Sequence, residues 1–181
     1  MVPMNRPDAR ADESCAVSVL RVATVFEDGT TALCARRLIG RILRMPVREI
    51  PIEEYAWDFH VLDQPDGMAV AGRRANAADV LVIAAWRDSA ALVRVIEWLQ
   101  HWLAPRREKF GALVFISVER DQTGPAVDPM GERLAHVARQ IEMDFFTTHV
   151  SPIAELLRDK GTLSSPHESH PLLYHFPTSR D

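Results

Sequence analysis

The chain has few cysteines, no excess of positive charge and no long apolar run, and each absence narrows its class. Its 181 residues include two cysteines, too few for a disulfide framework, which fits a reducing compartment. The net charge of −4 gives no electrostatic reason to expect nucleic-acid binding. No apolar stretch approaches the roughly 20 residues of a membrane helix, and the polar N-terminus lacks the apolar core of a secretory signal. We therefore expect a cytoplasmic protein that binds neither nucleic acid nor membranes.

Common catalytic signatures are also missing. The eight glycines do not form a G-x-G-x-x-G fingerprint, and the sequence has no G-x-S-x-G nucleophile elbow. The chain thus carries no local motif for dinucleotide binding or for serine hydrolysis.

Apolar segments rich in β-branched residues alternate with segments of helical periodicity along the chain. This alternation predicts a parallel sheet between two helix layers. We expect a three-layer, doubly wound α/β fold with a five-stranded parallel sheet in the flavodoxin-like order 2-1-3-4-5. Pro51 places the second strand at an edge, because proline cannot donate to a sheet ladder. The expected strands are 17–26, 47–52, 79–85, 111–118 and 145–150, and the expected helices are 31–44, 68–77, 89–103, one opening at Pro129, and 151–158.

These elements predict one domain. It spans residues 17–160, between a flexible N-terminal arm, 1–16, and a flexible C-terminal tail, 161–181. Cys34 lies within the first helix, where we expect it to be a small buried apolar residue. The segment 53–77 has the weakest pattern, and one interpretation is that it forms a lid over one end of the sheet.

The stretch ADVLVIAAW ends at a place where reactive groups are expected. In parallel sheets the carboxyl ends of the strands carry the chemistry. Here that end is Ala84, Ala85 and Trp86, which include no nucleophile and no acid. Our leading hypothesis is therefore a non-catalytic domain that binds a partner or a small ligand.

Glu27 and Asp28 follow the first strand and are the best candidates for a metal site. Adjacent carboxylates can bind a hard divalent cation such as Mg²⁺. Acidic residues before a helix also stabilise its positive end without any metal. The sequence leaves both interpretations open.

Two segments, VATVFEDGTTALCARRL and MDFFTTHVSPIAELL, resemble the first and last strand–helix units of response-regulator receiver domains. The likeness spans about residues 20–157. It implies that Glu27 and Asp28 occupy the Mg²⁺ positions and that Ser117 occupies the family's Ser/Thr position. The phosphorylated Asp falls at Ala84 and the Lys at Thr148, so the resemblance implies a pseudo-receiver that signals without phosphoryl transfer.

The stretches ADVLVIAA and VIEWLQHWL resemble flavodoxins and FMN-dependent reductases, and the chain is also similar to small bacterial proteins of this fold. The flavodoxin likeness implies an alternative function as an FMN-binding electron carrier or oxidoreductase. Gly29, Thr30 and Thr31 would hold the phosphate at a helix N-terminus, and Trp86 would lie near the ring. The neighbouring carboxylates oppose this, because like charges repel a phosphate.

Trp98 and Trp102 lie four positions apart in the expected helix 89–103 and so share one face. Wide aromatic rings often cover the edge of a domain core. An exposed pair would instead form an apolar strip for a homodimer through this helix. We carry both alternatives forward.

Overall fold

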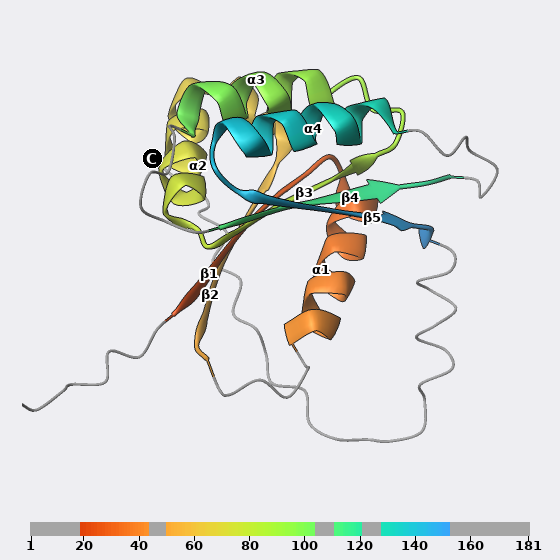
Figure 1. Cartoon of the computed structure of the whole chain (residues 1–181), viewed down its shortest axis with the longest axis horizontal. Helices are drawn as coiled ribbons and strands as arrows, with labels where there is room; N and C mark the ends of the chain where they lie inside the picture. Colours follow the sequence, from red (N-terminus) through yellow and green to blue (C-terminus); the bar gives the residue numbers. More distant parts are fainter. Residues whose placement is uncertain (1–18, 44–49, 104–110, 121–127, 153–181) are drawn as a thin grey trace, which may run out of the picture.

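A computed structural model describes residues 19–43, 50–103, 111–120 and 128–152. Its centre is a five-stranded, all-parallel sheet in the order β2-β1-β3-β4-β5 (Figure 1). This confirms the predicted flavodoxin-like α/β architecture and its strand order. The strands are β1 (Leu20–Phe26), β2 (Ile52–Asp58), β3 (Val80–Trp86), β4 (Ala112–Val118) and β5 (Asp144–Val150).

Helices cover both faces of the sheet. Among the described residues, α2, α3 and α4 pack on one face, and α1 lies on the opposite face (Figure 1). The helices are α1 (Gly29–Leu43), α2 (Pro65–Ala77), α3 (Leu92–Trp102) and α4 (Pro129–Gln140), with a short 3₁₀ helix η1 (Phe59–Asp63) before α2. Across the described ranges, no helix is both long and apolar enough to cross a bilayer.

The apolar residues of β3 explain its central position. From Leu81 to Ala85 the strand is buried, and successive side chains enter the two layers alternately. Leu81, Ile83 and Ala85 join the larger core under α2, α3 and α4, whereas Val82 and Ala84 join the smaller core under α1. A run of apolar residues without alternation is what a strand covered on both faces requires.

The second strand differs from its prediction. We expected it at 47–52, but β2 runs from Ile52 to Asp58, so Pro51 stands just before it. The edge position is confirmed, since β2 pairs only with β1 in this sheet. The carbonyl of Pro51 accepts a hydrogen bond from the amide of Leu20 at 2.9 Å, which fixes the start of the ladder. The sequence IEEYAWD lacks the continuous apolar pattern of a buried strand, because the side chains of this edge strand are only partly buried.

The remaining boundaries shift by at most three residues. The helices begin at Gly29, Pro65 and Leu92 rather than at 31, 68 and 89. Segment 53–77 is not a lid; it forms most of β2, η1 and α2, and α2 packs against α3. Cys34 is buried, as expected. The arm 1–16, the tail 161–181 and nearly all of the predicted helix 151–158 lie outside the described residues.

The two tryptophans of α3 belong to the fold. Trp98 is 3% exposed in the larger core, and its indole N–H points at the carbonyl of Met68 at 3.4 Å. Trp102 is half-buried and packs against that core beside Gly72 of α2. They do not form the exposed strip on which the homodimer hypothesis depended, and the core-edge interpretation holds.

Gly72 of α2 lies directly against the ring of Trp102 of α3. A Cβ atom there would lie 2.7 Å from the ring of Trp102, whereas a Cβ at Gly29 would meet nothing within 4 Å. We expect Gly72→Ala to lower the free energy of unfolding by about 1–3 kcal/mol through overpacking, despite alanine's higher helix propensity. Gly29→Ala is the matched control and should change it by less than about 0.5 kcal/mol. Equal urea midpoints for both variants would contradict this packing.

Candidate functional site

The carboxyl end of the sheet is organised around Asp28. Its Oδ1 accepts hydrogen bonds from the backbone amides of Thr30 and Thr31, each at 2.9 Å. These are first-turn amides of α1, the groups that bind anions at helix N-termini. Its Oδ2 accepts a hydrogen bond from the indole Nε1 of Trp86 at 2.7 Å. Asp28 therefore caps α1 and ties it to the end of β3.

Thr31 completes the cap from inside. Its side chain is fully buried, and its hydroxyl accepts from the amides of Glu27 at 3.1 Å and Asp28 at 2.9 Å. The same hydroxyl donates to the carbonyl of Asp28 at 2.9 Å. Since all of these partners are in the loop itself, the hydroxyl is oriented toward the protein.

Glu27 and Trp86 form the second link across the loop. Glu27 Oε2 accepts a hydrogen bond from the amide of Trp86 at 3.0 Å. The guanidinium of Arg120 lies over the Trp86 ring, 4.6 Å from its centroid, in cation–π geometry. Both predicted metal-binding carboxylates thus accept hydrogen bonds from Trp86, and one ring face is covered.

The pKa of Asp28 reflects this network. Partial burial by itself raises the pKa of the carboxyl. The hydrogen bonds from Thr31, Trp86 and Thr30 outweigh that burial and hold the pKa below its ordinary value of 3.8. Asp28 is therefore ionised at neutral pH and places a negative charge at the N-terminus of α1.

Neighbouring strand ends add a polar cluster beside the loop. Arg87 pairs with Glu119 at 2.6 Å, and His149 lies 3.4 Å from the same carboxylate. Within the described ranges, no three Asp, Glu, His or Cys side chains gather as a metal site would require. Glu27 and Asp28 therefore have no third such ligand among these residues.

Ala84 and Thr148, which the receiver resemblance puts at the positions of the phosphorylated Asp and the Lys, carry neither a carboxylate nor an amine. Ala84 is fully buried under α1, and Thr148 is half-buried within β5. Ser117 is also fully buried, on the opposite face of the sheet, and its hydroxyl lacks a hydrogen-bond partner among the described residues. The structure does not bring Ser117 together with Glu27 or Asp28.

The structure brings together Glu27, Asp28, Gly29, Thr30, Thr31 and Trp86, all of them sequence candidates. Hydrogen bonds among these residues use the groups that Mg²⁺ or FMN would need. The Asp28 carboxylate occupies the two amides that an FMN phosphate would need, and Thr31 is turned inward. The residues present therefore do not fit an FMN phosphate in this arrangement.

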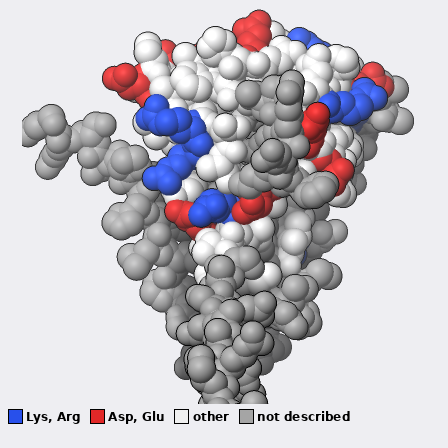
Figure 2. Space-filling model, turned by 60° about the vertical axis from the view of Figure 1, so that its left-hand side comes forward, with Lys and Arg blue, Asp and Glu red and all other residues white. Residues whose placement is uncertain are grey.

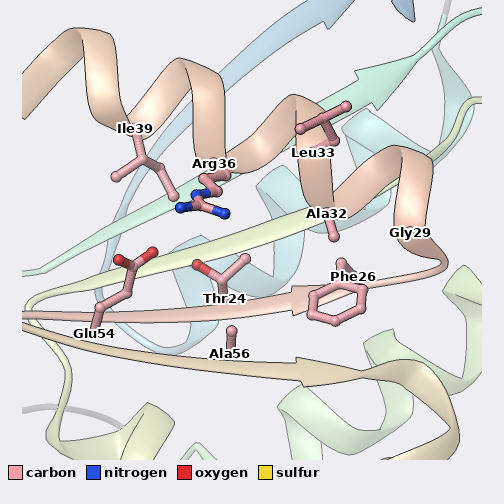
Figure 3. Close-up of a pocket in the computed structure, with 9 residues that line it drawn as sticks. All are labelled: Thr24, Phe26, Gly29, Ala32, Leu33, Arg36, Ile39, Glu54 and Ala56. Atoms are coloured by element: carbon pink, nitrogen blue, oxygen red, sulfur yellow. The ribbon is translucent and has the colours of Figure 1, made fainter. Parts of the chain in front are cut away.

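A cavity on the α1 side of the sheet was not predicted from the sequence. It has a volume of about 260 Å³ and opens between α1 and the β1–β2 pair (Figure 3). Among the described elements, α1 packs mainly on β1, β3 and β4, and the cavity lies on its β2 side. Its lining is mostly apolar: Phe26, Gly29, Ala32, Leu33, Ile39 and Ala56, with Thr24, Arg36 and Glu54.

The three polar residues gather at one end of the cavity. Arg36 of α1 and Glu54 of β2 point toward the same space from opposite sides, and Thr24 of β1 lies beside them, across from Ala56 (Figure 3). Thr24 is only 4% exposed, and its hydroxyl has no hydrogen-bond partner among the described residues. Phe26, Ala32 and Leu33 lie toward the other end, near Gly29 (Figure 3). The cavity is therefore amphipathic.

Burial raises the pKa of Glu54, and the positive charge of Arg36 reduces that shift without reversing it. A carboxyl whose pKa is higher in the folded state weakens folding as the pH rises through that pKa. We expect Glu54→Gln to be more stable than wild type at pH 7, with the gain disappearing below the ordinary pKa of 4.5. Thermal melting at pH 4 and pH 7 measures this. A gain of the same size at both pH values would contradict the shift.

Charges of both signs are interspersed on the face shown in Figure 2. Ion pairs among the described residues include Arg21 with Glu53 at 3.1 Å and Arg94 with Asp63 at 2.6 Å. No single-sign field appears on that face.

Comparisons with known proteins support the fold. No family model matches the chain, and no curated protein matches its sequence. Among solved structures it is similar to the Trp repressor binding protein from Bacillus subtilis, with 17% sequence identity and a TM-score of 0.50. The match covers 79% of this chain and 93% of that one. At this identity the likeness is one of architecture, and this chain has a flavodoxin-like α/β fold.

Proposed function

We propose that this protein is a non-catalytic, pseudo-receiver-like binding domain that acts through a small ligand or a partner. One observation carries the proposal: the Asp28 carboxylate takes the first-turn amides of α1 and the indole of Trp86. The edge where such folds hold phosphate, metal or flavin is thereby closed by the chain's own groups.

Phosphoryl transfer lacks its acceptor. The receiver resemblance puts Ala84 where a phosphorylated Asp stands, and a methyl group has no oxygen to accept phosphate. Thr148 replaces the lysine and carries no positive charge to pair with the product. A signalling role would therefore rest on binding rather than on modification at this edge.

The flavin alternative stays testable. An FMN phosphate would have to displace Asp28 from Thr30 and Thr31 and sit beside two carboxylates, which like-charge repulsion disfavours. We expect micromolar FMN to keep its fluorescence when mixed with the protein. Asp28→Ala should remove the competing charge, and Asp66→Ala, at the first turn of α2, serves as the matched control.

Fluorescence titration and the absorption spectrum of the purified protein provide the readout. Unquenched FMN with wild type and with Asp66→Ala supports the proposal. Stoichiometric quenching by wild type, or a yellow protein, would establish a flavoprotein and overturn it. Incorporation of phosphate from acetyl phosphate would show phosphoryl transfer to the protein and would also overturn the proposal.

A further inference from the structure

We propose that the cavity between α1 and the β1–β2 pair binds a small, neutral, amphipathic molecule with an apolar body and an amide-type head. This deepens the proposed binding function by assigning it a site and a ligand class. The cavity reaches the closed edge at Gly29, but its polar residues Thr24, Arg36 and Glu54 lie toward the other end, so the two proposals can fail separately.

The buried hydroxyl of Thr24 is the first argument. Thr24 faces the α1 layer, because its neighbours Ala23 and Val25 enter the opposite core. The Thr24 hydroxyl is buried without a hydrogen-bond partner among the described residues, which lowers the stability of the fold. A ligand group in the cavity would give this hydroxyl the partner that the described residues do not supply.

The two charged residues define the head group. A carboxylate accepts hydrogen bonds and a guanidinium donates them. An anionic head that pairs with Arg36 also lies beside Glu54, and a cationic head that pairs with Glu54 also lies beside Arg36, so in each case a repulsion offsets the attraction. A carboxamide or cyclic amide satisfies both, since its N–H can face Glu54 while its C=O faces Arg36 and Thr24.

The rest of the cavity defines the body and the size. Phe26, Leu33 and Ile39 offer apolar surface for a ring or a branched chain. The volume of about 260 Å³ is below the roughly 300–1,000 Å³ of sites for drug-sized ligands. The ligand is therefore metabolite-sized and much smaller than FMN.

Three probes with one ring and different heads test the class: benzamide, benzoate and benzylamine. Each is titrated into ¹⁵N-labelled full-length protein, and the backbone amides of Gly29, Ala32 and Ala56 are followed by NMR. We expect benzamide to shift these amides saturably with roughly millimolar affinity, as suits a fragment. Benzoate and benzylamine should bind at least about fivefold more weakly, because each meets one like charge.

Two variants separate binding from folding. Thr24→Val removes the hydroxyl at constant shape, so it should weaken benzamide about fivefold or more while raising the melting temperature. A purely structural threonine would not combine these two effects. Ala56→Leu should fill the cavity and abolish the shifts. Thr147→Val, on the exposed part of β5, is the control and should leave benzamide binding unchanged.

The outcomes are distinct. No saturable shift at the cavity with any probe overturns the site, and tighter binding of benzoate or benzylamine overturns the neutral head. Equal affinity of wild type and Thr24→Val also contradicts the assignment. If FMN is quenched but benzamide binding is unchanged, the proposed function is wrong and the cavity assignment still holds.

Discussion

Trp98→Ala is expected to destabilise the protein by about 3–5 kcal/mol, the usual cost of removing a large aromatic side chain from a core. Trp98 of α3 is 3% exposed in the larger core and its indole reaches the Met68 carbonyl of α2, so its loss leaves a cavity in that core. Urea unfolding measures the change. Gln100→Ala, at an exposed position of the same helix, is the control and should shift the unfolding free energy by less than about 0.5 kcal/mol.

The same variant separates a core role from an interface role. If Trp98 anchored a homodimer, the variant would sediment as a folded monomer whose stability no longer depended on concentration. We instead expect Trp98→Ala to lower the free energy of unfolding by the same amount at every protein concentration. A well-folded Trp98→Ala protein with a changed oligomeric state would show that α3 is an interface.

Asp28→Ala is expected to lower the free energy of unfolding by about 2–3 kcal/mol at pH 7. The lost cap accounts for about 1 kcal/mol, and the charge-assisted hydrogen bond to the Trp86 indole accounts for most of the rest. Asp66→Ala loses only a favourable helix-end charge and should cost at most about 1 kcal/mol. Chemical unfolding of both variants tests the difference.

The effect of Asp28 should depend on pH. Because its folded-state pKa lies below the ordinary value of 3.8, the stabilisation is present above pH 3.8 and is lost as the pH falls through the folded pKa. The stabilities of wild type and Asp28→Ala should therefore converge in acid. A difference that grows as the pH falls would mean that the carboxyl is not held by these hydrogen bonds.

The strand order was predictable because the central strands are covered on both faces. The run from Leu81 to Ala85 has no polar break, and its alternation with helical segments permits few topologies. The position of β2 was not predictable from its own residues. Glu53 pairs with Arg21 across the sheet, and Tyr55 stacks on Trp57, so the strand is stabilised by contacts that no local pattern reveals.

Only part of the closed edge could be predicted from the sequence. Acidic residues before a helix, such as Asp28, are expected to stabilise its positive end, with or without a metal. The indole of Trp86 lies 58 residues away in the chain, so its hydrogen bond to Asp28 needs the fold. The cavity depends on where α1 sits over the sheet, and no residue pattern encodes that placement.

A ¹H–¹⁵N NMR titration with FMN tests the closed edge most directly, because the Thr30 and Thr31 amides and the Trp86 indole N–H each give their own signal. If the Asp28 carboxylate holds all three, these signals stay in place up to millimolar FMN. Saturable movement of the three signals together would show that a phosphate can replace Asp28, and the account would be wrong.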